Sequence, residues 1–374
     1  MKILFISHNA HRAGAQLLLL NFIRWLKAHH KNIDLEILMG GKGALLKEFE
    51  QLAKTYLVDT GALKKGNLSR LTNQIKNKKR INTINKNTYD LYYSNTILNG
   101  ELLRMLNTGS TPVICHVHEM DYWISKAGAE NIDLIKEKTS YFFSASKAVK
   151  SILTASYEIP ESKIVPVYVP IDIKKILSVN QKQSLRSYLG LDKNTILIGA
   201  CGTESFRKGK DWFIPIAVQV LEQTKNEKLH FVWIGGKNSA ELQFDLNRCG
   251  YKNNIHFIEQ LPDAHTYFNE LSLFLMLSRE DPFPTVNLEA GIWETPILCF
   301  FNTGGTNELI EDGCGFAVPY ANLSAMTDKI IYLLANETER KLTGKRLKDK
   351  IIAKYDIEII GSEMVRLIKQ KINK

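Results

Sequence analysis

Short apolar runs alternate with amphipathic stretches along the whole chain, and this alternation restricts the possible folds more than any other feature. In the first half the runs are Ile3–Ser7, Ile33–Met39, Tyr56–Asp59, Leu91–Ser94, Val113–His118, Tyr141–Ala145 and Ile164–Tyr168. In the second half they are Thr195–Cys201, His230–Ile234, Ile255–Ile258, Leu271–Leu277, Pro296–Phe301 and Gly315–Val318. Helix-like stretches such as Ala15–Lys27 and Leu45–Ala53 separate them. Because strands joined by helices form βαβ units, the sequence predicts an α/β fold with parallel sheets.

The length of 374 residues suggests two domains. A polar, lysine-containing stretch runs from Pro170 to Leu191, and we place the joint between the domains there. The predicted parts are residues 1–175, residues 176–355 and a helical segment at 356–374. In doubly wound sheets, ligands bind outside the carboxyl ends of the strands. Residues that directly follow a strand are therefore the candidate site residues.

Composition narrows the class of protein. A hydrophobic fraction of 44% and a charged fraction of 24% are typical of a soluble globular chain. No apolar run reaches the length of about 18 residues that a membrane span needs, and the N-terminus has no signal-peptide pattern. The five cysteines show no CxxC spacing. We expect a cytoplasmic protein with reduced thiols rather than a disulfide framework or a zinc site.

The positive charge is concentrated in the first half of the chain. Of the net +10, residues 1–170 carry +9, and the densest cluster is Lys76, Lys78, Lys79, Arg80 and Lys86. Such a cluster can be a solvated helix face, or it can bind an anionic membrane surface or nucleic acid. The cluster lacks interleaved aromatic residues and a nucleic-acid-binding motif. We therefore expect no nucleic-acid partner and rank an anionic membrane surface ahead of it.

Two strand ends in the first half carry polar residues. The segment after the first strand, His8 to Gln16, contains Gly14 but not the G-x-G-x-x-G pattern of dinucleotide-dependent oxidoreductases. His116 and His118 share one side of a strand because side chains alternate, but a metal site would need further ligands. Because a histidine at a strand end is more often structural, we expect His116 and His118 not to bind a metal.

The stretch from Ser278 to Gly291 combines a buried strand, a loop broken by prolines and the start of a helix. Proline is tolerated in the first helical turn, so a helix after Pro284 is expected. Its free N–H groups and dipole favour an anion such as a phosphate. Asp281 and Glu289 stand eight residues apart, and Glu289 can accept hydrogen bonds from hydroxyls beside that phosphate. Alternatively, both acids are solvated. Earlier in the chain, Arg207 and Lys208 follow a strand and can neutralise a diphosphate.

With Phe283-Pro284 and Glu289-Ala290, this stretch resembles the signature of the retaining, nucleotide-sugar-dependent glycosyltransferases of family 4, the group 1 glycosyltransferases with the GT-B fold. Their motif is an acid, seven residues and then Glu; this chain has Asp281 where many members have Glu. The resemblance implies two Rossmann-like doubly wound domains facing a central cleft. It also implies that residues 1–175 bind the acceptor, that 176–355 bind the nucleotide sugar, and that 356–374 pack back on the first domain.

The resemblance also implies roles for single residues. In this scheme Arg207 and Lys208 hold the leaving diphosphate, Glu289 holds the ribose, and Asp281 and His118 contact the transferred sugar. The expected catalytic residues are His118, Arg207, Lys208 and Asp281. The expected donor-binding residues are Gly14, Gly235, Gly236, Phe283, Pro284, Thr285, Val286, Glu289, Gly304 and Gly305. The expected acceptor-side residues are His8, Asn95 and Glu119.

The function that the resemblance implies is retaining transfer of a sugar from a nucleotide-diphosphate sugar to a hydroxyl acceptor. We expect a lipid-linked or polysaccharide acceptor, a place in cell-surface polysaccharide or glycolipid synthesis, and peripheral attachment at the inner face of the cell membrane. The chain contains no Asp-x-Asp, so no metal and no other cofactor are expected. A nucleotide-sugar epimerase, a phosphorylase with pyridoxal phosphate, and a non-catalytic sugar- or lipid-binding protein of the same fold stay open. The residue types name neither the base nor the sugar.

Overall fold

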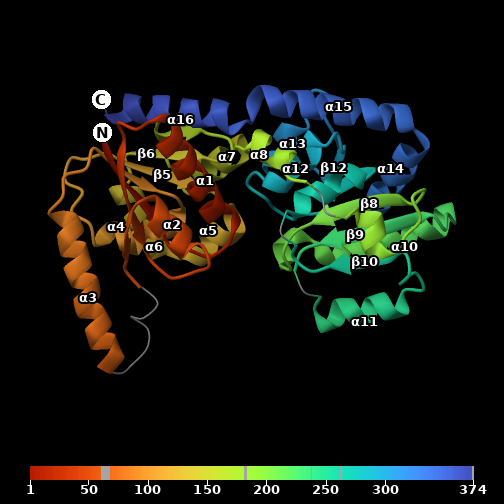
Figure 1. Ribbon diagram of the computed structural model, residues 1–374, viewed down its shortest axis with the longest axis horizontal. Coiled ribbons are helices and arrows are strands. Elements are labelled where there is room, and N and C mark those ends of the chain that lie inside the picture. Colours follow the sequence, from red (N-terminus) through yellow and green to blue (C-terminus); the bar gives the residue numbers. More distant parts are fainter. Residues whose placement is uncertain (60–67, 181–182, 237, 262, 373–374) are drawn as a thin grey trace. The chain divides into compact units, whose positions relative to one another are not determined.

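The computed structural model describes residues 1–59, 68–180, 183–236, 238–261 and 263–372. The chain forms two compact units, one from Met1–Pro170 with the C-terminal residues from Ile357 onward, and one from Ile171–Asp356 (Figure 1). Each unit is built on its own parallel sheet. The structure thus has the α/β class that the alternation of apolar runs predicts.

The sheet of the N-terminal unit has the order β3-β2-β1-β4-β5-β6-β7, with all seven described strands parallel. The strands are β1 (Lys2–Ser7), β2 (Asp34–Met39), β3 (Lys54–Leu57), β4 (Leu91–Ser94), β5 (Val113–Val117), β6 (Tyr141–Ser144) and β7 (Ile164–Pro166). The helices are α1 (Gly14–His29), α2 (Leu46–Leu52), α3 (Leu68–Asn85), α4 (Gly100–Arg104), α5 (Asp121–Ala127), α6 (Ala129–Lys138), α7 (Lys147–Ala155) and α16 (Ile357–Ile372).

The sheet of the C-terminal unit has the order β10-β9-β8-β11-β12-β13 and is also parallel. Its strands are β8 (Ile196–Cys201), β9 (Leu229–Ile234), β10 (Ile255–Ile258), β11 (Leu273–Met276), β12 (Ile297–Phe300) and β13 (Phe316–Val318). Its helices are α8 (Ile173–Ser178), α9 (Leu185–Leu189), α10 (Phe213–Thr224), α11 (Ala240–Arg248), α12 (Thr285–Ile292), α13 (Gly305–Leu309), α14 (Leu323–Ala335) and α15 (Glu337–Lys354).

Alternation along the central strand β1 divides the core of the N-terminal unit into two layers. Ile3 and Phe5 point to one face, where α1 and α16 cover them. Leu4 and Ile6 point to the other face and pack with residues of α4 to α7. Because both faces are covered by helices, the strand reads as a continuous apolar run. Its carboxyl end is then free to present polar loop residues.

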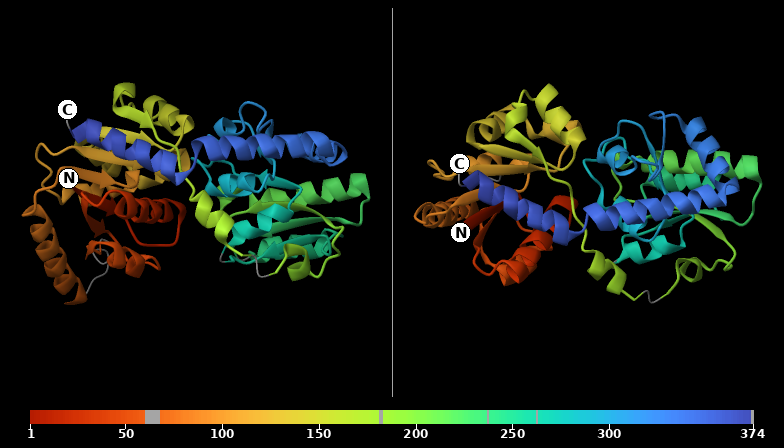
Figure 2. Two further views of the ribbon diagram at one scale, coloured as in Figure 1. Left: turned by 45° about the horizontal axis from the view of Figure 1, so that its top comes forward. Right: turned by 90° about the horizontal axis from the view of Figure 1, so that it is seen from above.

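The C-terminal helix α16 is part of the N-terminal unit and lies along it (Figure 2). The indole Nε1 of Trp25 on α1 donates a hydrogen bond to the Glu358 carboxylate at 3.0 Å. A Cβ atom at Gly361 would lie only 2.8 Å from the ring of Trp25, so glycine lets the two helices approach closely. Ile360 and Met364 complete the buried contact.

The division between the units falls slightly before the predicted boundary at residue 175. The Ile171 amide donates to the Tyr355 carbonyl at 3.0 Å. Ile171 also forms a parallel bridge with Asp356. The chain is therefore joined to the second unit directly after Pro170. In the described part of the chain, none of the helices combines the length and apolarity required to cross a bilayer.

The contact between α15 and the turn that follows α12 yields a first prediction. Gly344 lies in α15, and a Cβ atom there would come within 1.9 Å of the Glu294 carbonyl oxygen. Glycine to alanine in an open helix normally stabilises by about 1 kcal/mol. Here we expect Gly344→Ala to lower the free energy of unfolding by about 1–3 kcal/mol, because α15 must move away from the backbone at Glu294. Urea denaturation followed by circular dichroism measures the change.

Gly14→Ala is the matched control, since no heavy atom lies within 4 Å of a Cβ atom at Gly14. It should leave the denaturation midpoint unchanged or slightly higher. A gain in stability from Gly344→Ala would show that α15 can move away from Glu294 at no cost.

Candidate functional site

In the N-terminal unit, the adjacent strands β1, β4 and β5 bring three candidate residues to one edge of the sheet. His8 follows β1, and its Nε2 atom lies 3.2 Å from Gln16 Nε2. The Asn95 side chain follows β4 and donates to the Ala15 carbonyl at 2.7 Å. His118 follows β5. The fold therefore gathers His8, Asn95 and His118 as the sequence predicts, although their roles stay predictions.

Glu119 is buried at the same edge and braces two strand ends. Its carboxylate accepts hydrogen bonds from the Thr96 hydroxyl, from the Ile97 amide at 3.3 Å and from the His118 amide at 3.0 Å. Burial raises the pKa of Glu119 to about 7, although these hydrogen bonds oppose the shift. The structure thus directs this carboxyl toward the β4 loop. The acceptor contact expected for Glu119 stays a prediction.

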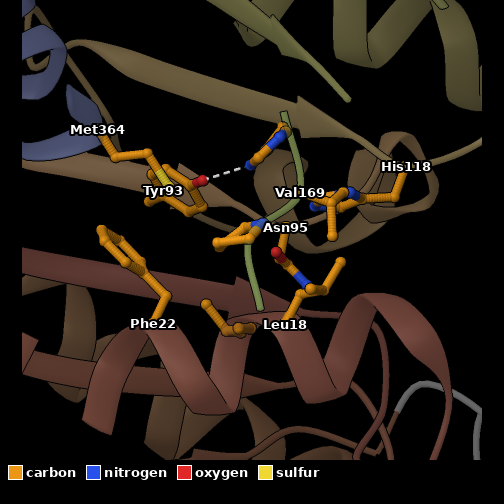
Figure 3. Close-up of a pocket in the computed structure, with 10 residues that line it drawn as sticks. Leu18, Phe22, Tyr93, Asn95, His118, Val169 and Met364 are labelled. Carbon is orange, nitrogen blue, oxygen red and sulfur yellow. Dashed lines mark hydrogen bonds between the residues drawn. The ribbon is translucent and has the colours of Figure 1, made fainter. Parts of the chain in front are cut away.

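A small cavity of about 20 Å³ lies beside His118 and is lined by side chains from α1, β4, β5 and α16 (Figure 3). The rings of His116 and His118 lie 4.0 Å apart between centroids. The Tyr93 hydroxyl makes a 2.6 Å hydrogen bond with His116 Nδ1. Both ring nitrogens of His118 are buried without a hydrogen-bond partner among the described residues.

Burial lowers the pKa of His118 to about 4, so its imidazole is neutral at pH 7. Burial and the neighbouring His118 lower the pKa of His116 as well. A neutral imidazole can donate to or accept from a hydroxyl, but it offers no fixed charge. Within the described ranges, no group of three or more His, Cys, Asp and Glu side chains is placed to hold a metal ion.

The C-terminal unit carries a charged cluster at the corresponding edge of its sheet. A 3₁₀ turn, Phe206–Lys208, follows β8 and places two cations against one carboxylate. Asp281 Oδ2 lies 2.8 Å from Arg207 Nη1 and 2.6 Å from Lys208 Nζ. Burial alone would raise the pKa of Asp281, but Lys208 and Arg207 outweigh it and hold the pKa below its usual value. With two cations and one carboxylate, the cluster has a formal charge of about +1 and suits an anion.

The helix expected after Pro284 is α12, which begins at Thr285 beside this cluster. Thr285 and Val286 occupy its first turn, where backbone N–H groups lack intrahelical partners. The loop with Gly304 and Gly305 is tied to the cluster, because the Asp281 amide donates to the Thr303 carbonyl at 2.7 Å. Gly305 donates back to the Asp281 carbonyl at 3.2 Å. Catalytic and donor-binding candidates from three loops therefore lie close together.

The two donor-binding candidates directly before α12, Phe283 and Pro284, are buried. Phe283 is 4% exposed, and its ring packs 5.3 Å from that of Tyr355. Pro284 is buried too. Their observed contacts therefore anchor the loop before α12, and their contact with a donor stays a prediction.

Gly235 and Gly236 end β9 in conformations that favour glycine, with φ of 116° and 73°. A Cβ atom at these positions would meet the Gly202 carbonyl at 2.9 Å or the Glu204 amide at 2.7 Å. Glycine at both positions therefore keeps the β8 and β9 loops in close contact. Gly14, in the N-terminal unit, is different, because space is open around it.

Glu289 lies in the second turn of α12 and is partly exposed. Its carboxyl has no hydrogen-bond partner in the part of the chain that the structure describes. Burial raises the pKa of Glu289 to about 7. A carboxyl without a partner beside a helix start is a group that can accept hydrogen bonds from ligand hydroxyls.

Among the residues that contact the candidate groups, Tyr93 and Arg279 were not anticipated from the sequence. Tyr93 holds His116, but only the strand register brings their side chains together. Arg279, in the stretch from Ser278 to Gly291, contacts the turn that carries Arg207 and Lys208. Its position directly after Ser278 at the end of a strand was a usable signal.

A family model described as "Glycosyl transferases group 1" matches residues 193–336. The capsular polysaccharide biosynthesis glycosyltransferase CapM of Staphylococcus aureus is 24% identical over 111 residues, which cover 30% of this chain and 29% of CapM. The O-antigen biosynthesis glycosyltransferase WclY of Escherichia coli is 27% identical over 181 residues, 48% of each chain. The matched regions thus span less than half of these curated relatives.

Solved structures match over nearly the whole chain. HepE of Anabaena in complex with UDP-glucose has a TM-score of 0.81 at 19% identity, covering 99% of this chain and 100% of HepE. Sucrose-phosphate synthase of Thermosynechococcus elongatus has a TM-score of 0.78 at 15% identity, covering 100% and 99%. These likenesses show that the chain has the GT-B fold, as the sequence predicts.

The raised pKa of Glu289 yields a second prediction. As pH rises from about 4.5 to about 7, the unfolded chain loses this proton while the folded chain keeps it, so stability falls across that window. Glu289→Gln has no proton to lose. We expect the variant to be more stable than wild type at pH 8, by about 1–3 kcal/mol, and the difference to shrink toward pH 5. Urea denaturation at the two pH values measures it.

Glu222→Gln, at an exposed position of α10, is the control and should show the same small difference at both pH values. A Glu289→Gln variant whose stability relative to wild type does not depend on pH would contradict the buried environment assigned to this carboxyl.

Proposed function

We propose that the chain is a retaining glycosyltransferase of family 4. It moves a sugar from a nucleotide-diphosphate sugar to a hydroxyl acceptor in cell-surface polysaccharide or glycolipid synthesis. The observation that carries the proposal is the cluster of Arg207, Lys208 and Asp281 beside the start of α12. Two cations, free helix N–H groups and glycine loops at one sheet edge are the groups that a departing diphosphate needs.

Each unit contributes its own chemistry in this proposal. In the C-terminal unit, Arg207 and Lys208 stabilise the negative charge that develops on the leaving diphosphate, together with the N–H groups of Thr285 and Val286. Glu289 accepts hydrogen bonds from the ribose hydroxyls. In the N-terminal unit, neutral His118 hydrogen-bonds a hydroxyl of the transferred sugar, and His8 and Asn95 line the acceptor side. The leaving phosphate helps to deprotonate the acceptor hydroxyl.

Asp281 also contacts the transferred sugar in this proposal, through one of its two carboxylate oxygens. Its Oδ2 atom already binds both cations, so Oδ1 is the oxygen left to accept a hydrogen bond from a sugar hydroxyl. The aspartate side chain is one methylene shorter than the glutamate common at this position. The sugar must therefore approach the cation cluster closely.

The first donors to test follow from the similar proteins. HepE was crystallised with UDP-glucose, and LpcC of Rhizobium leguminosarum, 25% identical over 173 residues, is described as a mannosyltransferase of lipopolysaccharide core synthesis. We therefore propose UDP-glucose and GDP-mannose as the first donors and capsule, O-antigen or lipopolysaccharide glycans as acceptors. A thermal-shift panel of nucleotides identifies the base, because a ligand that binds only the folded chain raises its melting temperature.

The third prediction tests the role of the cation pair. With a donor that the wild type uses, Lys208→Ala should lower kcat about 100-fold, the loss typical for removing one group that stabilises developing charge. The reaction needs no metal in this proposal, so EDTA should leave the wild-type rate unchanged. Release of the nucleoside diphosphate measures the rate.

Lys348→Ala is the matched control, since Lys348 also pairs with a carboxylate, Glu294 at 2.8 Å, but lies on α15. It should turn over at the wild-type rate. A Lys208→Ala variant of near wild-type activity would refute the assigned role, and abolition by EDTA with rescue by magnesium would refute metal independence.

We further propose peripheral attachment to an anionic membrane surface through α3, which stands at the side of the N-terminal unit (Figure 1). Lys76, Lys78 and Lys79 are exposed on this helix, and so is Ile75 at 67%. Arg80, which the sequence placed in the same cluster, instead donates to the Leu57 carbonyl at 2.7 Å. The basic face of α3 is therefore Lys76, Lys78 and Lys79, with Lys86 beyond them.

The fourth prediction tests this basic face. The wild type should sediment with phosphatidylglycerol vesicles at low salt, not with phosphatidylcholine vesicles, and salt should release it. Replacing Lys76, Lys78 and Lys79 with Gln should abolish sedimentation, because each lysine contributes about 1 kcal/mol near an anionic surface. The control replaces Lys341, Lys345 and Lys348 of α15. Equal sedimentation of the two triple variants would leave the basic face of α3 as a solvated surface.

A further inference from the structure

We propose that Arg279 is a positioning residue that holds the turn Phe206–Lys208 in place so that Arg207 and Lys208 can bind a diphosphate. The inference rests on the function proposed above. It assigns this task to a residue that precedes the motif from Asp281 to Glu289. Arg279 lies in the loop after β11, two residues before Asp281. Its side chain is 13% exposed and points back over the turn.

Arg279 contacts the turn and the segment after it through backbone, charge and ring interactions. Its amide donates to the Arg207 carbonyl at 2.7 Å, and its Nη1 donates to the Phe206 carbonyl at 2.5 Å. The guanidinium forms two hydrogen bonds to the Asp211 carboxylate, at 2.9 and 2.7 Å. It also lies 3.9 Å from the ring centroid of Phe206 and 4.0 Å from that of Trp212. One side chain therefore links both ends of the segment from Phe206 to Trp212.

The turn contributes little stability of its own. It is a 3₁₀ turn of three residues, too short for a stable hydrogen-bond ladder of its own. Phe206 is 65% exposed, so its burial contributes little. Gly209 follows with φ of 68°, and a Cβ atom there would lie 2.1 Å from the Leu277 carbonyl, which fixes the exit from the turn. The entry and the middle depend on Arg279 and on the side-chain contacts of Arg207 and Lys208, which are the ion pairs with Asp281 and the hydrogen bond from Arg207 to the Glu280 carbonyl at 2.8 Å.

These two anchors differ in what a bound diphosphate does to them. A phosphate oxygen that binds Arg207 and Lys208 competes with Asp281 for the same cationic atoms. The contacts of Arg279 involve carbonyl oxygens, rings and Asp211, and none of these groups is assigned to the ligand. The Arg279 contacts therefore hold the backbone of the turn while its side chains exchange Asp281 for phosphate. This preorganisation matters because a displacement of about 1 Å in a binding group can cost about 100-fold in rate.

The fifth prediction compares a nucleoside diphosphate with its monophosphate. Arg279→Lys keeps the charge but loses the planar fork that binds Asp211 and stacks on the rings. Calorimetric titration with UDP and UMP gives the dissociation constant of UMP divided by that of UDP. This ratio reports the contribution of the second phosphate. For a base other than uracil, the same pair of that base is used. We expect Arg279→Lys to lower this ratio about tenfold, with a change of less than about twofold for the monophosphate.

Two further variants separate positioning from folding. Arg186 makes a comparable set of contacts with Glu270 and the Thr195 carbonyl, away from the turn, and Arg186→Lys should leave the ratio unchanged. Asp211 is exposed, and Asp211→Asn weakens the grip on Arg279 without removing a core group. It should lower the ratio in the same direction but less. Hydrogen exchange of a peptide covering Ser205 to Gly209 should accelerate in Arg279→Lys and not in Arg186→Lys.

The outcomes distinguish the inference from the proposed function. If the wild type binds no nucleoside diphosphate more tightly than its monophosphate, the proposed function fails and the inference fails with it. If the wild type prefers the diphosphate and Arg279→Lys keeps the full preference, the inference alone is overturned. An equal loss for UDP and UMP in Arg279→Lys would also overturn it, because that result indicates a general structural role.

Discussion

The carboxylate of Asp281 is buried, and the cations that neutralise it organise the edge of the C-terminal sheet. An isolated buried carboxylate is strongly destabilising, and removing one partner of a buried pair typically costs about 3–5 kcal/mol. Asp281 therefore requires Arg207 and Lys208 at 2.8 and 2.6 Å. Because its backbone also pairs with the Thr303 loop, one residue joins the turn after β8, the loop after β11 and the loop after β12.

The two units present contrasting electrostatics at their strand ends. In the C-terminal unit, Lys208 and Arg207 outweigh the effect of burial and hold the pKa of Asp281 below its usual value. In the N-terminal unit, burial without charge partners lowers the pKa of His118 to about 4 and raises that of Glu119 to about 7. The sheet edge of the C-terminal unit suits a phosphate, whose charge must be balanced. The sheet edge of the N-terminal unit suits neutral hydroxyl groups, which a sugar and an alcohol acceptor would present.

The outline of the site could be read from the sequence because it depends on local rules. Each apolar run predicted as a strand overlaps one, although β3 begins at Lys54 rather than Tyr56. Proline tolerance placed the start of α12 after Pro284, and the structure has it at Thr285. Local rules could not show that Phe283 is buried against Tyr355, or that Arg80 hydrogen-bonds the Leu57 carbonyl instead of facing solvent.

The strands, their helical connections and the kinds of residue at each strand end follow from the sequence alone, since periodicity and turn chemistry act over a few neighbouring positions. Which of those residues are partners depends on the three-dimensional fold. Lys208 and Asp281 are separated by 73 positions, and Glu119 accepts a hydrogen bond from Thr96 across 23. Such pairs depend on strand order and register, which bring distant loops within hydrogen-bonding distance. No local pattern shows which distant loops come together, so the contacts of Arg279 with the turn are seen only in the folded chain.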